Sequence, residues 1–153
     1  MRELYHIVNG LPPAADAFTG TVYSDIISMK NFEHISFIIH GGTGATGTSV
    51  ITVEACDDVS GSNVSALPFV YQECVSGDTF GSITKAATTG FTTTAASNKM
   101  HKIDIDADVL AASGYGYIRL KAVESVNDPV TCGILAILTE PRYEQEIFDT
   151  AIV

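Results

Sequence analysis

Apolar and polar residues alternate with a period of two along much of the chain. The clearest case is residues 33–40, in which Ile35, Phe37 and Ile39 fall on one face. Residues 49–56 repeat the pattern after a glycine-rich stretch. Because successive side chains of a strand point to opposite faces, both segments predict strands with one buried face. Two such strands joined by a glycine-rich link predict an antiparallel hairpin.

The remaining pattern predicts a fold made almost entirely of strands. Further strands are expected at residues 67–75, 100–106, 115–123 and 130–138, and the last is apolar on both faces, which favours an interior position. Residues 79–97 are rich in Thr, Ala, Gly and Ser and predict short strands or a long loop, whereas residues 107–112 suit a helical turn that ends at Gly114. Turn residues every 8–15 positions predict an all-β fold. We expect a single antiparallel β-sandwich, either jelly-roll or immunoglobulin-like.

Both ends of the chain carry apolar residues without a regular pattern. Near the N-terminus Asn9-Gly10 and Pro12-Pro13 interrupt any regular element, and Pro141 precedes the C-terminal segment. Two interpretations of the N-terminal residues are open: they pack on their own domain, or they form an arm that is buried on a neighbouring subunit. We divide the chain into an N-terminal arm at 1–20, a β-sandwich domain at 21–140 and a C-terminal arm at 141–153.

The composition limits the class of protein. A chain of 153 residues with 46% hydrophobic residues forms one globular domain. The 18 acids against 8 Lys and Arg give a net charge of −10, which argues against nucleic acid and anionic membranes as partners. The N-terminus lacks a signal-peptide pattern, so we expect a soluble protein synthesised in a cytoplasm.

Charge is unevenly placed in the first half of the chain. Between Asn31 and Thr84 there is no Lys or Arg. This stretch predicts either a solvated acidic face or a negative patch for a basic partner. Its six acids are Glu33, Glu54, Asp57, Asp58, Glu73 and Asp78.

No motif in the sequence indicates catalysis or a bound cofactor. The three cysteines lack CxxC spacing and predict small, partly buried thiols rather than disulfides or a zinc site. The carboxylate pairs Asp57-Asp58 and Asp104/Asp106 could each hold Ca²⁺, but neither has the spaced acidic loop of an EF-hand. We therefore expect no catalytic residue, no cofactor and no metal ligand.

Three tyrosines are the candidates for a carbohydrate-stacking surface in a chain without tryptophan. They are Tyr71, Tyr115 and Tyr117. Packing in the core or at its rim explains them equally well.

Several segments resemble small virion proteins of tailed bacteriophages. They are residues 29–43, the run Ile51-Thr52-Val53-Glu54-Ala55-Cys56-Asp57-Asp58, and Tyr115-Gly116-Tyr117-Ile118-Arg119-Leu120 followed later by Pro141-Arg142-Tyr143. The sequence is similar over residues 24–143 to capsid decoration (cement) or auxiliary head proteins. The resemblance implies a β-rich domain on the outer surface of an icosahedral shell, commonly a trimer, with the major capsid protein as its partner.

We therefore expect a virion structural protein, not an enzyme, that binds and stabilises the assembled capsid. The alternative is a tail, head-fibre or host-glycan adhesion component of the virion. Apolar arms would bury surface across subunit junctions, and repetition over a lattice would multiply modest contacts. The expected contact residues are Leu4, Tyr5, Ile7, Val8, Phe18, Tyr143, Ile147 and Phe148.

Overall fold

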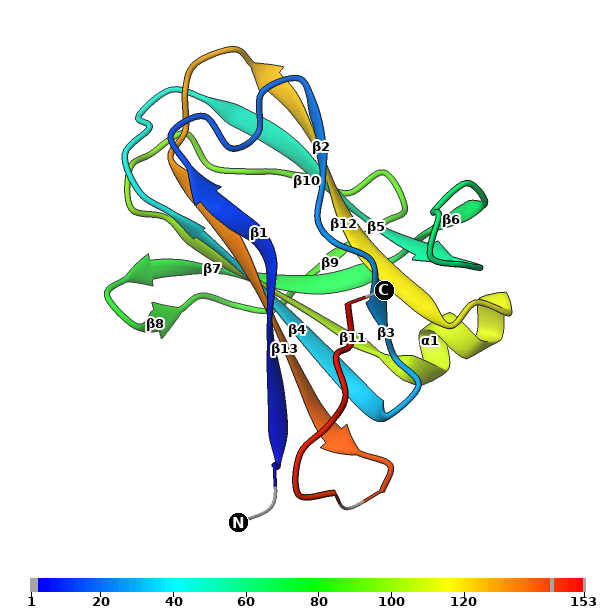
Figure 1. Ribbon diagram of the computed structural model, residues 1–153. Helices are drawn as coiled ribbons and strands as arrows, with labels where there is room; N and C mark the ends of the chain where they lie inside the picture. The colour runs from blue at the N-terminus through cyan, green and yellow to red at the C-terminus, as the bar shows by residue number, and fades with distance from the viewer. Residues whose placement is uncertain (1–2, 144, 153) are drawn as a thin grey trace.

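The computed structural model describes residues 3–143 and 145–152, which fold into two packed antiparallel sheets (Figure 1). In this part of the chain the larger sheet has seven strands, in the order β1 (Tyr5–Ala14), β13 (Cys132–Pro141), β4 (Phe32–Gly41), β11 (Met100–Asp106), β7 (Phe69–Ser76) and β8 (Thr79–Phe80), with β9 (Thr84–Ala86) also paired to β7. The smaller has six, in the order β10 (Phe91–Thr92), β5 (Thr48–Cys56), β12 (Tyr117–Val126) and β2 (Thr21–Tyr23), with β3 (Ile27–Ser28) on β12 and β6 (Val64–Leu67) on β5. The prediction of an all-β sandwich is confirmed.

The strands pair in a nested order. β1 pairs with β13, β2 and β3 with β12, β4 with β11, and β5 with β10. The first strand thus meets the last, and each following strand meets the next one inward, which is the jelly-roll arrangement rather than the immunoglobulin-like one. The segment from β6 to β9 is inserted between β5 and β10, and its strand β7 extends the larger sheet beyond β11.

The core lies between the sheets and is filled by every second residue of the long strands. Ile35 and Phe37 of β4 and Ile51 and Val53 of β5 belong to this core, and all four are fully buried. The short helix α1 (Ala107–Ser113) covers one end of this core with Leu110 and ends at Gly114, whose φ of 81° is left-handed. The predicted helical turn is confirmed.

The predicted hairpin between residues 33–40 and 49–56 is wrong. β4 pairs with β13 and β11, whereas β5 pairs with β12 in the opposite sheet. The glycine-rich loop between them crosses from one sheet to the other and runs against the backbone near Asp128, where a side chain at Gly47 would collide. Alternation shows which face of a strand is buried, but two such faces pack across a sandwich as readily as they lie side by side.

Of the two interpretations of the N-terminal residues, the structure bears out packing on their own domain, and the arm predicted at 1–20 is wrong. Residues 5–14 form β1, which pairs with β13 from Tyr5 opposite Thr139 to Ala14 opposite Cys132. Register irregularities flank Leu11 and absorb Gly10 and the two prolines, which an edge strand tolerates because one side of its backbone needs no partner. These residues therefore belong to the sandwich.

The C-terminal arm predicted at 141–153 is wrong as well, since its described residues pack on the domain. The segment 145–152 runs between β1 and β3 (Figure 1). The Phe148 ring is tilted against the Phe32 ring, with centroids 4.6 Å apart, and the Phe148 N–H donates to a Glu3 carboxylate oxygen over 2.7 Å. The Ser28 N–H donates to the Ala151 carbonyl. The segment covers the open side of the sandwich. The predicted arms also include residues 1–2, 144 and 153, which lie outside the described residues.

Candidate functional site

The eight expected contact residues divide into buried and exposed groups. Val8, Phe18 and Phe148 are 3%, 5% and 4% exposed in the protein's own core, so the expectation that they contact a partner is wrong. The other five each expose between 57% and 81% of their surface. They are Leu4, Tyr5, Ile7, Tyr143 and Ile147.

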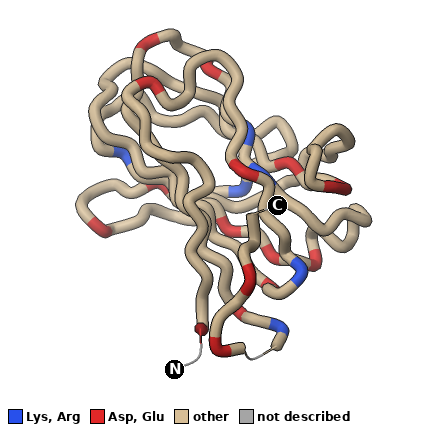
Figure 2. The backbone as a smooth tube through the Cα atoms, in the orientation of Figure 1, with Lys and Arg blue, Asp and Glu red and all other residues tan. Residues whose placement is uncertain are grey.

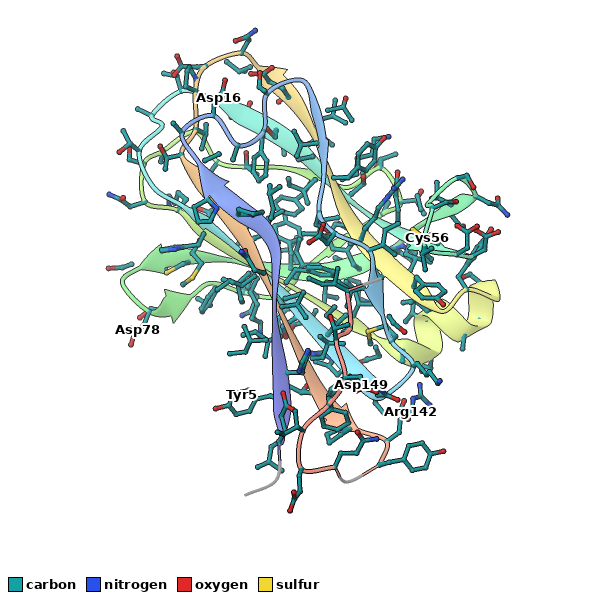
Figure 3. All side chains as sticks on the ribbon, viewed as in Figure 1. Tyr5, Asp16, Cys56, Asp78, Arg142 and Asp149 are labelled. Atoms are coloured by element: carbon teal, nitrogen blue, oxygen red, sulfur yellow. The ribbon has the colours of Figure 1, made fainter. Side chains whose placement is uncertain are left out.

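The exposed residues of β1 continue onto the neighbouring strands. Tyr5 and Ile7 project from the outer face of the larger sheet, and Figure 3 shows the Tyr5 side chain pointing away from the body. Ile7 lies opposite Ile137 of β13, and the next outward residue of β13, Leu135, lies opposite Ile38 of β4. We call Tyr5, Ile7, Ile38, Leu135 and Ile137 the apolar band.

The C-terminal segment carries a further exposed apolar residue. The hydrogen bond between Phe148 and Glu3 holds that segment against the N-terminal end of β1. Ile147, the residue before Phe148, is 81% exposed. The segment therefore buries one apolar side chain and presents its neighbour to the outside.

A polar cluster occupies the same sheet face beside the apolar band. Asp106 Oδ1 lies 2.7 Å from His34 Nδ1, and the Ser36 hydroxyl donates to Asp104 Oδ1 over 2.6 Å. His34 Nε2 is 3.3 Å from the Ser36 oxygen. The register of β4 against β11 brings these residues together. The sequence signal was the polar outer positions of both strands, but nothing in it paired them.

This cluster has the composition of a serine–histidine–aspartate triad but not its proton arrangement. The Ser36 proton points to Asp104 rather than to the imidazole, so the hydroxyl is not aligned for proton transfer to His34. The four side chains are partly or fully exposed on an open sheet face. The arrangement suits hydrogen bonding to a partner surface better than activation of a nucleophile.

The cation-free stretch does not form one acidic face. Glu33 pairs with Arg142 over 2.9 Å, Glu54 with Arg119 over 2.8 Å, and Glu73 with Lys99 over 2.7 Å. Each of these cations comes from a later part of the chain. Figure 2 shows acids distributed over the whole backbone. The loop acids are exposed and keep the predicted solvated character; they are Asp57, Asp58 and Asp78.

The pKa values of Glu73 and His101 are both shifted. Burial alone would raise the pKa of Glu73, but hydrogen bonds from Lys99 and Thr94 outweigh it and lower that pKa. Burial lowers the pKa of His101, which is 3% exposed. The His101 ring therefore stays neutral at neutral pH, packed 5.4 Å from the Phe91 ring between centroids.

The described residues also test for a metal site, for the state of the cysteines and for a membrane-spanning helix. Among them, no three His, Cys, Asp or Glu side chains gather as metal ligands would, and no helix has the length and apolar character needed to cross a bilayer. The three cysteines are free and buried, which confirms the predicted burial of their thiols. Burial raises the pKa of the Cys132 thiol to about 12.

A groove lies between α1, the segment 28–31 and the end of β13. It has a volume of about 580 Å³. Tyr115, Tyr117 and Tyr143 line it together with Lys30 and Arg142. Two of the three candidate stacking tyrosines thus meet in one place. Tyr71, the third, instead stacks on the Phe91 ring at 3.9 Å between centroids.

Comparisons with known proteins give a structural likeness. No protein-family model and no curated protein sequence matches the chain. The crystal structure of the SPBc2 prophage-derived protein YomS is similar, with a TM-score of 0.50 and 14% identity. The likeness covers 92% of this chain and 96% of that one. At this identity the likeness shows the fold, and it extends over nearly the whole length of both proteins.

Proposed function

We propose that this protein is a bacteriophage virion component that binds the outer surface of the assembled capsid and stabilises it. The apolar band at the β1 edge carries the proposal. The near full-length likeness to a prophage-derived protein supports the phage origin. The resemblance of residues 24–143 to decoration proteins supports the place on the capsid.

An exposed apolar face on an edge strand calls for a partner. Edge strands offer unpaired backbone groups, and natural proteins usually protect them with charge or cover. The outer face of β1 instead presents Tyr5 and Ile7, each 57% exposed, beside Leu135, which is 42% exposed. A contiguous apolar patch of this kind is typical of an interaction surface.

The energy available from the apolar band suits a repeated contact. Full burial of a side chain of this size contributes ~1.5–3 kcal/mol, so covering three half-exposed ones contributes on the order of 3–4 kcal/mol before ordering costs. A single contact of that strength is weak. A trimer that places three apolar bands on neighbouring major capsid proteins gains avidity, and binding only to the assembled shell stabilises it by mass action.

Binding to purified virions that lack the protein tests this role. The variant Ile7→Asp places a charge in the apolar band, and Val75→Asp is the matched control because Val75 is a strand residue of 60% exposure on β7, away from β1. We expect the first variant to lose most of its binding and the second to bind like the unmodified protein. Equal binding by all three proteins would remove the apolar band from the interface.

Copy number separates the capsid role from its alternative. Hundreds of copies per virion, measured by quantitative mass spectrometry against the major capsid protein, support decoration of the capsid. A dozen or fewer support a tail, head-fibre or adhesion component. The tyrosine-lined groove is the observation that favours adhesion as the second candidate.

A further inference from the structure

We propose that the groove beside α1 binds an acidic saccharide, a sugar that carries a carboxylate. Its volume of about 580 Å³ falls within the ~300–1,000 Å³ of pockets that hold small organic ligands. This site shares no side chain with the apolar band, so it stands independently of binding to the capsid.

The charges around the groove favour an anion. Its lining contains Lys30 and Arg142 and no acid, although the chain carries a net charge of −10. Lys30 is exposed and has no ion-pair partner among the described residues. The backbone N–H of Arg142 donates to the Asn31 carbonyl, and this bond holds Arg142 against the segment that carries Lys30. One nitrogen of its guanidinium pairs with Glu33, and the remaining N–H groups can donate to a ligand carboxylate.

The aromatic side chains favour a sugar ring. Tyr115 and Tyr117 flank Gly116, whose backbone borders open space with no atom near the position of an added Cβ. Tyr143 lines the same groove from the end of β13. A phenol ring offers an apolar face for the C–H groups of a pyranose and a hydroxyl for its oxygens. Leu110, almost fully buried, provides an apolar floor.

The overall charge argues for a small acidic ligand over an acidic polypeptide. A polypeptide with several carboxylates would extend beyond the groove over a protein with 18 acids against 8 Lys and Arg, where like charges repel it. A saccharide with one carboxylate can place that charge between Lys30 and Arg142 and keep its neutral rings on the tyrosines. The charge is then confined to the part of the surface that attracts it.

Calorimetry with the full chain tests this site. The probes are disaccharides that contain sialic, glucuronic or galacturonic acid, each beside its neutral counterpart, together with hexa-aspartate. We expect at least one acidic disaccharide to bind 10-fold or more tightly than its neutral counterpart, and more weakly as salt is added. Binding of hexa-aspartate but of no saccharide would overturn the proposal, as would the absence of binding by every probe.

Charge-neutralising variants locate the binding. Lys30→Gln and Arg142→Gln should each weaken binding of the acidic disaccharide by about 10-fold. Both variants should keep the Tm within a few degrees of the unmodified protein, since both side chains are exposed. Lys85→Gln is the matched control because Lys85 is an exposed cation on β9, outside this groove. Equal loss in all three variants would indicate attraction to general charge and would overturn the assignment to the groove.

Discussion

Replacing Phe148 with alanine tests whether the C-terminal segment is part of the folded domain. Phe148 is 4% exposed and its ring lies 4.6 Å from that of Phe32 between centroids. Core Phe→Ala substitutions cost ~3–5 kcal/mol, and the lower end applies here because a terminal segment can relax around the lost ring. We expect Phe148→Ala to lower the free energy of unfolding by about 3 kcal/mol, which for a domain of this size lowers Tm by roughly 6–12 °C.

The neighbouring residue provides the control. Ile147 is 81% exposed, and Ile147→Ala should change the free energy of unfolding by about 0.5 kcal/mol or less. Urea denaturation followed by circular dichroism measures both variants, and equal m-values show that the same surface unfolds. If Phe148→Ala unfolds within about 0.5 kcal/mol of the unmodified protein, the segment does not pack on the domain and the account of the closed sandwich fails.

Three further perturbations test the interior. Glu54→Ala should lower the free energy of unfolding by about 2–3 kcal/mol, because it leaves Arg119, which is 13% exposed, without its carboxylate partner. The same substitution should lower it much less when Arg119 is already alanine, and additive losses would refute the coupling between the two residues. Gly90→Ala should lower the free energy of unfolding by about 3 kcal/mol or more, since φ is +77° and a Cβ would collide with the Ile51 carbonyl. Gly77 is also left-handed but borders open space, so Gly77→Ala should lower it by only about 1 kcal/mol. Similar Tm losses in the two variants would contradict this reasoning. The pKa of His101 is lowered in the folded protein, so the contribution of its neutral ring to stability is complete above pH 6.5 and declines as the pH falls towards the folded pKa. Between pH 7 and pH 5 the Tm should therefore drop less in His101→Gln than in the unmodified protein. Parallel curves of Tm against pH would show that His101 does not cause this loss.

Sequence periodicity was sufficient to predict the long strands but not to predict which strands pair with one another. Ile35, Phe37 and Ile39 were expected to share one face, and all three are buried. β13 is flanked by β1 and β4, as its two apolar faces predicted. Alternation carries no information about which strand lies alongside, so the crossing of β4 and β5 to opposite sheets could not be seen. That choice depends on how the complete chain fills its core.

The chain ends were misjudged for a different reason. β1 contains two prolines and a glycine, which hide an edge strand because irregular pairing absorbs them. The C-terminal segment buries Phe148 and Ala151 without a repeating pattern, so its sequence does not predict its contact with the core. The exposed contact candidates Leu4, Tyr5 and Ile7 came from apolar character alone. The cluster around His34 depends on a register that the sequence does not encode locally.

The nested strand order has a consequence for biosynthesis. β1 cannot gain its partner until β13 has emerged, so residues 5–14 wait for residues 132–141. Val8 and Phe18 stay uncovered during that interval, as substrates for chaperones or for premature association. Domains dominated by such distant pairings fold in roughly milliseconds to seconds. The sandwich therefore cannot close before β13 is available, and a nascent chain truncated before residue 132 lacks the strand that completes it.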